Sequence, residues 1–127
     1  MFLGLRTVVY PAPNLAAAKA SFTRLLGHEP YFDEPDYVGY SVGGYELGLD
    51  PHADPANGAV TFWGVPDAAV AYAELLARGA TALGPVTEVG DGIRLGTVRE
   101  PTGNIVGVIE NPIFELPPAP THDGPGR

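Results

Sequence analysis

The sequence predicts an α+β fold in which one unit, a strand, a helix and three further strands, occurs twice. The 127 residues suit a single domain. Two amphipathic stretches, residues 15–26 and 68–78, each follow a proline and an N-capping residue, and β-rich runs follow each stretch in the same order. PNLAAAKASFTRLLG also resembles PDAAVAYAELLARG, and ELGLDP resembles VGVIENP, which indicates an internal repeat.

The first unit is expected at about residues 3–51. Residues 3–10 (LGLRTVVY) are β-rich, and Asn14 is a suitable N-cap for a helix over residues 15–26 that Gly27 ends. Three short strands are expected at residues 29–33, 37–42 and 45–49. The pair Gly43-Gly44 favours a two-residue hairpin turn between the last two strands.

The second unit is expected at about residues 59–113, after a Pro-, Asp- and Gly-rich loop over residues 50–58. A strand at residues 59–65 precedes Asp67, which caps a helix over residues 68–78 that Gly79 ends. Strands at residues 82–89, 93–99 and 105–109 complete the unit. The domain should therefore span residues 1–115, and residues 116–127, with four Pro and two Gly, should form a flexible tail.

The stretch EPTGNIVGVIENP, residues 100–112, predicts a tight turn followed by the last strand. Pro101 fixes its φ angle, Gly103 allows the reversal, and Asn104 is expected at a left-handed corner. Both parities of residues 105–109 are apolar, which predicts a strand covered on both faces, by a helix on one and a cavity or second sheet on the other.

Composition excludes several classes of partner. Asp and Glu number 15 against 7 Lys and Arg, a formal charge of −8, and no basic cluster is present, so nucleic acid and anionic membrane surfaces are not expected partners. The charge favours a neutral or cationic ligand, and it agrees equally with an acidic surface that only keeps the protein in solution. Cysteine is absent, and no signal sequence or long apolar run is visible, so the sequence predicts a cytoplasmic protein.

The repeat and the acidic-Pro-x-Gly-Asn turn together resemble the vicinal-oxygen-chelate superfamily, which includes glyoxalase I, ring-cleaving dioxygenases and bleomycin-resistance proteins. Glu100 stands where that superfamily usually has Asp. The resemblance covers residues 3–112. It implies that two βαβββ modules form a curled mixed sheet, a half-open cup, and that two chains pair as a homodimer.

Enzymes of that superfamily hold a divalent metal with one side chain from each of four strands, drawn from His, Glu and Gln. The resemblance places these positions on Thr7, on Leu47 or Gly48, on Val60 and on Gly107. None of these residues is a strong metal ligand, so we expect no metal and no cofactor.

Five other residues are possible metal ligands. A one-residue shift of register would turn a neighbouring carboxylate, Glu46 or Glu110, into the cup. The three histidines are less suitable because they lie in loops or in the tail: His28, His52 and His122.

Strand parity predicts which side chains line the cup. Val9 and Phe62 should face the cavity with Thr7 and Val60, whereas the alternate residues Val8, Tyr10, Trp63 and Val65 should pack toward the helices. Tyr31, Phe32, Tyr37, Tyr40 and Tyr45 gather in the first module, and Arg94 and Arg99 lie on a strand of the second. The candidate ligand-binding residues are Thr7, Val9, Phe32, Tyr40, Leu47, Val60, Phe62, Arg94, Gly107 and Ile109.

Three functions agree with these features. The first is a metal-independent small-molecule-binding protein of the bleomycin-resistance type, which sequesters an aromatic or cationic natural product and confers antibiotic resistance. The alternative is a metal-dependent glyoxalase, lyase or dioxygenase-type enzyme of the same superfamily, and the third is a structural or regulatory dimer without a ligand. The first is the functional prediction. The sequence identifies neither the ligand, nor a catalytic residue, nor the mode of module pairing.

Overall fold

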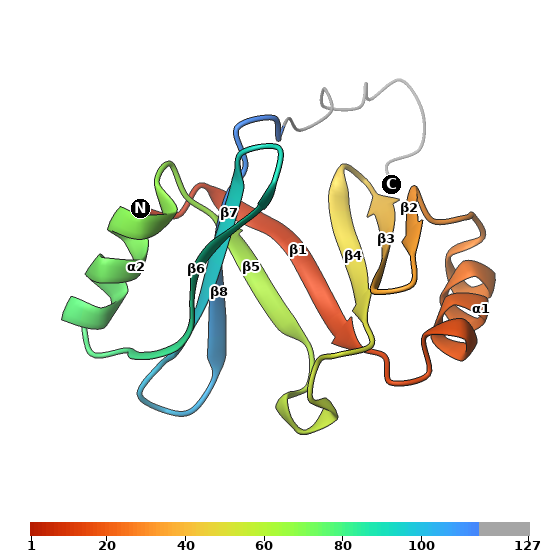
Figure 1. Cartoon of the computed structure of the whole chain (residues 1–127), viewed down its shortest axis with the longest axis horizontal. Coiled ribbons are helices and arrows are strands. Elements are labelled where there is room, and N and C mark those ends of the chain that lie inside the picture. The colour runs from red at the N-terminus through yellow and green to blue at the C-terminus, as the bar shows by residue number, and fades with distance from the viewer. Residues whose placement is uncertain (115–127) are drawn as a thin grey trace, which may run out of the picture.

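A computed structural model of the chain describes residues 1–114, in which a βαβββ module occurs twice (Figure 1). The expected tail at residues 116–127 lies outside this part of the chain. The first module consists of β1 (Gly4–Pro11), α1 (Leu15–Leu26), β2 (Phe32–Glu34), β3 (Tyr37–Val42) and β4 (Tyr45–Asp50). Strand β2 begins three residues later than expected, since Pro30 has no amide hydrogen to donate to a ladder.

The second module follows a short 3₁₀ helix in the connecting loop, η1 (Pro55–Asn57). It consists of β5 (Val60–Gly64), α2 (Ala68–Ala77), β6 (Thr81–Gly90), β7 (Ile93–Arg99) and β8 (Ile105–Glu110). The order of helices and strands is therefore the predicted one. Neither α1 nor α2 is long and apolar enough to cross a membrane.

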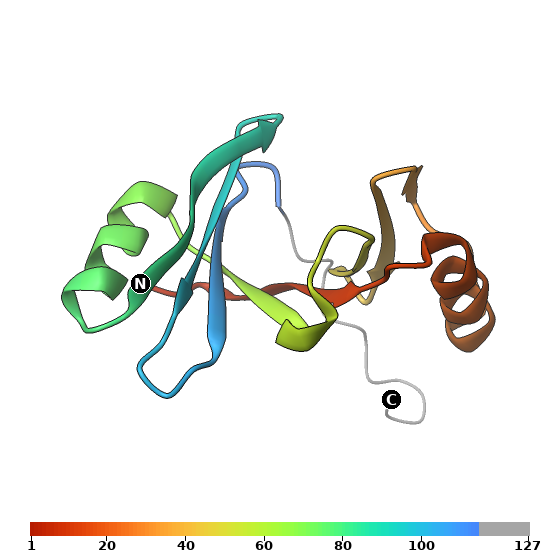
Figure 2. The same cartoon turned by 60° about the horizontal axis from the view of Figure 1, so that its bottom comes forward.

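All eight strands form one mixed sheet in the order β2-β3-β4-β1-β5-β8-β7-β6. At its centre β1 and β5 are antiparallel, and each is parallel to the last strand of its own module, β4 or β8. The outer strands of the two modules rise on either side of this centre (Figure 2). The sheet stays open, because β2 and β6 are its two edges.

Both helices begin where the sequence predicts, and α1 also ends there, whereas α2 ends at Ala77, one residue earlier than expected. The Asn14 side chain accepts a hydrogen bond from the Ala17 amide at 3.1 Å, and the Asp67 side chain accepts one from Val70 at 3.1 Å. Gly27 adopts φ = 81° at the end of α1, a conformation that favours glycine. These local caps explain why the helix starts could be read from sequence alone.

Each helix covers its own end of one sheet face with a separate apolar core. Under α1 the buried residues are Ala12, Val38, Tyr40 and Leu49, and under α2 they are Val65, Ala68, Ala71 and Val108. Burying a Val or Leu side chain contributes about 1.5–3 kcal/mol, so these clusters hold the helices to the sheet. Within residues 1–114, the opposite face of the sheet has no helix over it.

The turn between β7 and β8 is held by the Glu100 carboxylate. It accepts hydrogen bonds from the Thr102 hydroxyl and amide and from the backbone and side-chain amides of Asn104. Gly103 occupies the positive-φ corner at 107°. The prediction that Asn104 adopts a left-handed conformation is wrong, since its side chain binds Glu100 and Gly103 makes the reversal.

This network predicts a pH dependence of stability. The hydrogen bond from the Thr102 hydroxyl, with those from backbone amides, lowers the pKa of Glu100 from 4.5 to about 2. The pKa of Glu100 is lower in the folded chain than in the unfolded chain. Its ionised carboxylate therefore stabilises the fold fully at pH values above the unfolded pKa of 4.5. This stabilisation decreases as the pH falls from about 4.5 to about 2, and it is absent at still lower pH. In thermal melts, Glu100→Gln should lower the Tm at pH 7 but scarcely at pH 2.

Glu88→Gln, on the exposed face of β6, is the matched control and should show no such difference between the two pH values. An equal loss of Tm at pH 7 and pH 2 for Glu100→Gln would contradict this role of the carboxylate.

Candidate functional site

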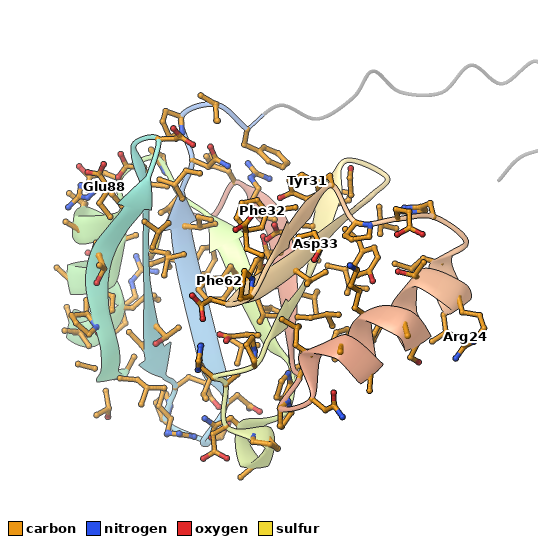
Figure 3. The ribbon with its side chains drawn as sticks, turned by 45° about the vertical axis from the view of Figure 1, so that its right-hand side comes forward. Arg24, Tyr31, Phe32, Asp33, Phe62 and Glu88 are labelled. Atoms are coloured by element: carbon orange, nitrogen blue, oxygen red, sulfur yellow. The ribbon has the colours of Figure 1, made fainter. Side chains whose placement is uncertain are left out.

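The helix-free face of the sheet encloses an open cavity of about 820 Å³ between the two modules. Its walls come from residues of β1 to β8 and from the segments around Tyr31 and Phe114. Tyr31 and Phe32 project from the first module's edge, whereas Phe62 lies on the central strand β5 (Figure 3). A concave, mostly apolar surface of this size is typical of small-molecule sites.

Four backbone partners form a row across the floor of the cavity. Glu46 on β4 pairs with Thr7 on β1, Thr7 pairs with Phe62 on β5, and Phe62 pairs with Gly107 on β8. The Phe62 ring lies over Gly107, with its Cδ2 atom 2.4 Å from the position that a Cβ atom would take. The row therefore offers one carboxylate, one hydroxyl, one phenyl ring and no fourth side chain.

Two tyrosines bind the Glu46 carboxylate. The Tyr37 hydroxyl donates to Oε1 at 2.8 Å, and the Tyr31 hydroxyl donates to Oε2. Partial burial and the hydrogen-bonded Glu46 carboxylate raise the pKa of both Tyr31 and Tyr37 above the usual value, so both hydroxyls stay protonated donors. Tyr37 can reach this position because Gly48 has no Cβ atom beneath its ring.

A β-bulge brings Arg6 into the same cavity. The pairing of β1 with β5 shifts between Leu5 and Thr7, so Arg6 is an additional residue and lines the cavity together with Thr7. The Arg6 side chain crosses Gly64, and its guanidinium carbon lies 3.9 Å from the centre of the Phe114 ring. Sequence patterning missed Arg6, because regular alternation would place it on the face opposite to Thr7.

Comparisons with known proteins identify the fold. No protein-family model and no curated protein sequence matches the chain. A variant of Streptomyces coelicolor methylmalonyl-CoA epimerase in complex with 2-nitronate-propionyl-CoA superposes with a TM-score of 0.71 at 14% identity, covering 88% of this chain and 99% of that one. The chain has the vicinal-oxygen-chelate fold. The resemblance seen in the sequence is thus confirmed at the level of the fold.

Two further structures share the vicinal-oxygen-chelate fold. A glyoxalase/bleomycin resistance protein/dioxygenase superfamily member from Vibrio splendidus 12B01 gives a TM-score of 0.63 at 17% identity, covering 84% of this chain and 99% of that one. The Mn(II)-bound glyoxalase from Novosphingobium aromaticivorans gives 0.69 at 15% identity, covering 95% of this chain but 43% of that one.

The donor set in this cavity does not fit the metal that enzymes with the vicinal-oxygen-chelate fold hold. Within residues 1–114, no three His, Asp or Glu side chains converge on a common point. Glu46 faces the cavity, as the register alternative allowed, but Glu110 faces the helices and accepts hydrogen bonds from the Ala68 amide at 2.9 Å and Arg94 at 3.5 Å. A divalent ion at the row would have one strong protein ligand, where stable sites have three or four.

The structure separates the ten candidate ligand-binding residues into three groups. Thr7, Val9, Phe32, Phe62 and Ile109 line the cavity, whereas Val60 is half-buried outside its walls and Gly107 lies beneath Phe62.

Three other candidates lie on the helix face, and their assignment to the cavity is therefore wrong. Tyr40 is fully buried and bonds Thr23 and the Lys19 carbonyl, Leu47 packs against the core under α1, and Arg94 pairs with Glu110. In each strand the neighbouring residue, Ser41, Glu46 or Leu95, takes the cavity side, because successive side chains alternate between faces.

Proposed function

We propose that this protein binds a small organic cation with a planar apolar body in the cavity, and that it does so without a metal ion. The observation that carries the proposal is the Glu46 carboxylate on the cavity floor. Within residues 1–114, Glu46 belongs to none of the ion pairs and is held only by the tyrosine hydroxyls. A ligand ammonium group would supply the missing positive charge.

Aromatic rings beside Glu46 support a planar, cationic ligand. Tyr31 and Phe32 lie with ring centroids 6.5 Å apart, and Phe32 and Tyr37 lie 6.2 Å apart, so the three form a connected aromatic wall. Tyr31 is 64% exposed, Phe32 45% and Tyr45 40%, although core packing would bury such rings. Exposed aromatic faces around a carboxylate favour cations through cation–π attraction.

The charge of the cavity favours the same ligand class. Three carboxylates, those of Glu46, Asp50 and Asp91, line it together with one cation, Arg6. The whole chain carries a formal charge of −8, which attracts cations over a distance of about one Debye length. The metal-dependent alternative is not favoured because of the donor set. The homodimer, the cytoplasmic location and the role in antibiotic resistance stay predictions.

Tryptamine, an indole with a protonated amine, is a suitable probe for the proposal. Calorimetry or ligand-observed NMR should detect its binding, and Glu46→Gln should weaken that binding at least tenfold, since Gln keeps the shape and removes the charge. Glu88→Gln, an exposed carboxylate on β6, is the matched control and should bind as the unmodified protein does. Equal tryptamine affinities for the Glu46→Gln and Glu88→Gln variants would overturn the proposal.

A further inference from the structure

Arg6 is the one cation among the described residues that line the cavity. The four ion pairs within residues 1–114 do not include it, although Asp50 and Asp91 line the same cavity. Its guanidinium makes a single hydrogen bond there, a long one of 3.4 Å from Nη1 to the Leu5 carbonyl. Since a guanidinium carries five N–H donors, most of them have no protein acceptor within residues 1–114.

The fold nevertheless holds the Arg6 side chain in place. The bulge turns it toward the cavity, the absence of a side chain on Gly64 leaves room for its guanidinium group, and the Phe114 ring stacks on that group. A Cβ atom on Gly64 would lie 2.6 Å from Arg6 Nε, so a larger residue there would displace the arginine. The guanidinium is thus positioned in advance, which lowers the entropic cost of binding an anion.

The positive and negative groups lie on opposite sides of Thr7. Glu46 is its partner on β4, whereas Arg6 crosses Gly64 on β5, and no Arg6 nitrogen lies within 4 Å of a Glu46 oxygen. On the cavity floor, the Glu46 carboxylate therefore lies on the β4 side of Thr7 and the Arg6 guanidinium on the β5 side.

We propose that Arg6 binds a carboxylate of the ligand, so that the ligand is a zwitterion whose ammonium group meets Glu46. For the contact between the ligand ammonium group and Glu46, this inference rests on the proposed function. A carboxylate is the expected anion, because its two oxygens match the fork of a guanidinium. The apolar body then lies beside the two charged groups, against Phe32 and Phe62.

Three indole compounds test the inference in the unmodified protein: tryptophan, with both charges, tryptamine, with the ammonium alone, and indole-3-propionate, with the carboxylate alone. Tryptophan should bind about tenfold more tightly than tryptamine, because it adds one charge-assisted contact. Equal affinities for tryptophan and tryptamine would overturn the inference while leaving the proposed function intact.

Substitution of Arg6 locates the effect. Arg6→Gln should weaken tryptophan binding more than tryptamine binding, so that the preference for tryptophan disappears, and Arg6→Lys should retain part of the preference. Arg24→Gln, an exposed arginine in the last turn of α1 (Figure 3), is the control and should keep it in full. A preference that survives Arg6→Gln would show that another group binds the carboxylate and would overturn the inference.

The two proposals can fail separately. If no indole amine binds and Glu46→Gln has no effect, the proposed function fails. If indole-3-propionate nevertheless binds in an Arg6-dependent manner, Arg6 is an anion site but the zwitterion is wrong. If Arg6→Gln lowers the Tm and leaves every indole affinity unchanged, Arg6 only anchors Phe114 and the inference is overturned. The comparison of the three compounds uses the unmodified protein. It therefore tests the inference even if the Arg6→Gln variant does not fold.

Discussion

Replacing Thr7 and Phe62 by histidine should convert a chain that is indifferent to divalent metals into one that binds zinc. Glu46, Thr7 and Phe62 are backbone partners on three adjacent strands, so the double variant would present one carboxylate and two imidazoles on one face. Three such ligands with an open fourth position form a usual zinc site. In the unmodified protein these positions supply only one strong metal ligand, Glu46, so its Tm should not change when zinc is added.

Melting curves with and without metal provide the measurement. At 100 times its dissociation constant, zinc should stabilise the Thr7→His/Phe62→His variant by about 2.7 kcal/mol, whereas Zn, Ni, Mn or Fe(II) should leave the Tm of the unmodified chain unchanged. Adding Glu46→Gln to the double variant is the control and should remove most of the zinc response. A metal-dependent rise in the Tm of the unmodified protein would contradict our account of the row and restore the enzyme hypothesis.

Gly48→Ala should destabilise the protein and also weaken ligand binding, although it adds one methyl group. The added Cβ would lie 1.8 Å from the Tyr37 hydroxyl oxygen and 2.5 Å from Cζ of the same ring. The φ angle of Gly48 is not positive, so the cost is steric rather than conformational. Overpacking of this kind costs typically 1–3 kcal/mol, and the displaced Tyr37 would no longer donate to Glu46.

A double-mutant cycle separates this clash from other effects. Tyr37→Leu removes the ring, so Gly48→Ala should be tolerated much better in that background than alone, with a coupling of about 0.5–3 kcal/mol in denaturant melts. Additive losses of stability would show that Tyr37 does not rest on Gly48. Tryptamine affinity should fall in each single variant, because each removes the hydrogen bond from Tyr37 to Glu46.

The sequence by itself determined the order of helices and strands, because the signals for them are local. Asn14 and Asp67 cap their helices through contacts three residues along the chain, and Gly27 ends α1 through its own φ angle. Alternation within one strand also placed Val9 and Phe62 on the cavity side, since that depends only on the period of two. The repeat of these local signals was sufficient to predict the fold.

Only the tertiary structure decided which polar groups meet in the cavity, because that depends on pairing between distant strands. Glu46 rather than Leu47 faces the cavity, since the β4 register against β1 is set by the whole sheet, and a one-residue shift exchanges the faces. Arg6 enters through a bulge that alternation does not reveal. Glu110, equally acidic in the sequence, is instead turned to the amide at the start of α2. The strand to which each residue belongs follows from nearby residues in the sequence. The face of the sheet on which each charged side chain lies depends on pairing with distant strands.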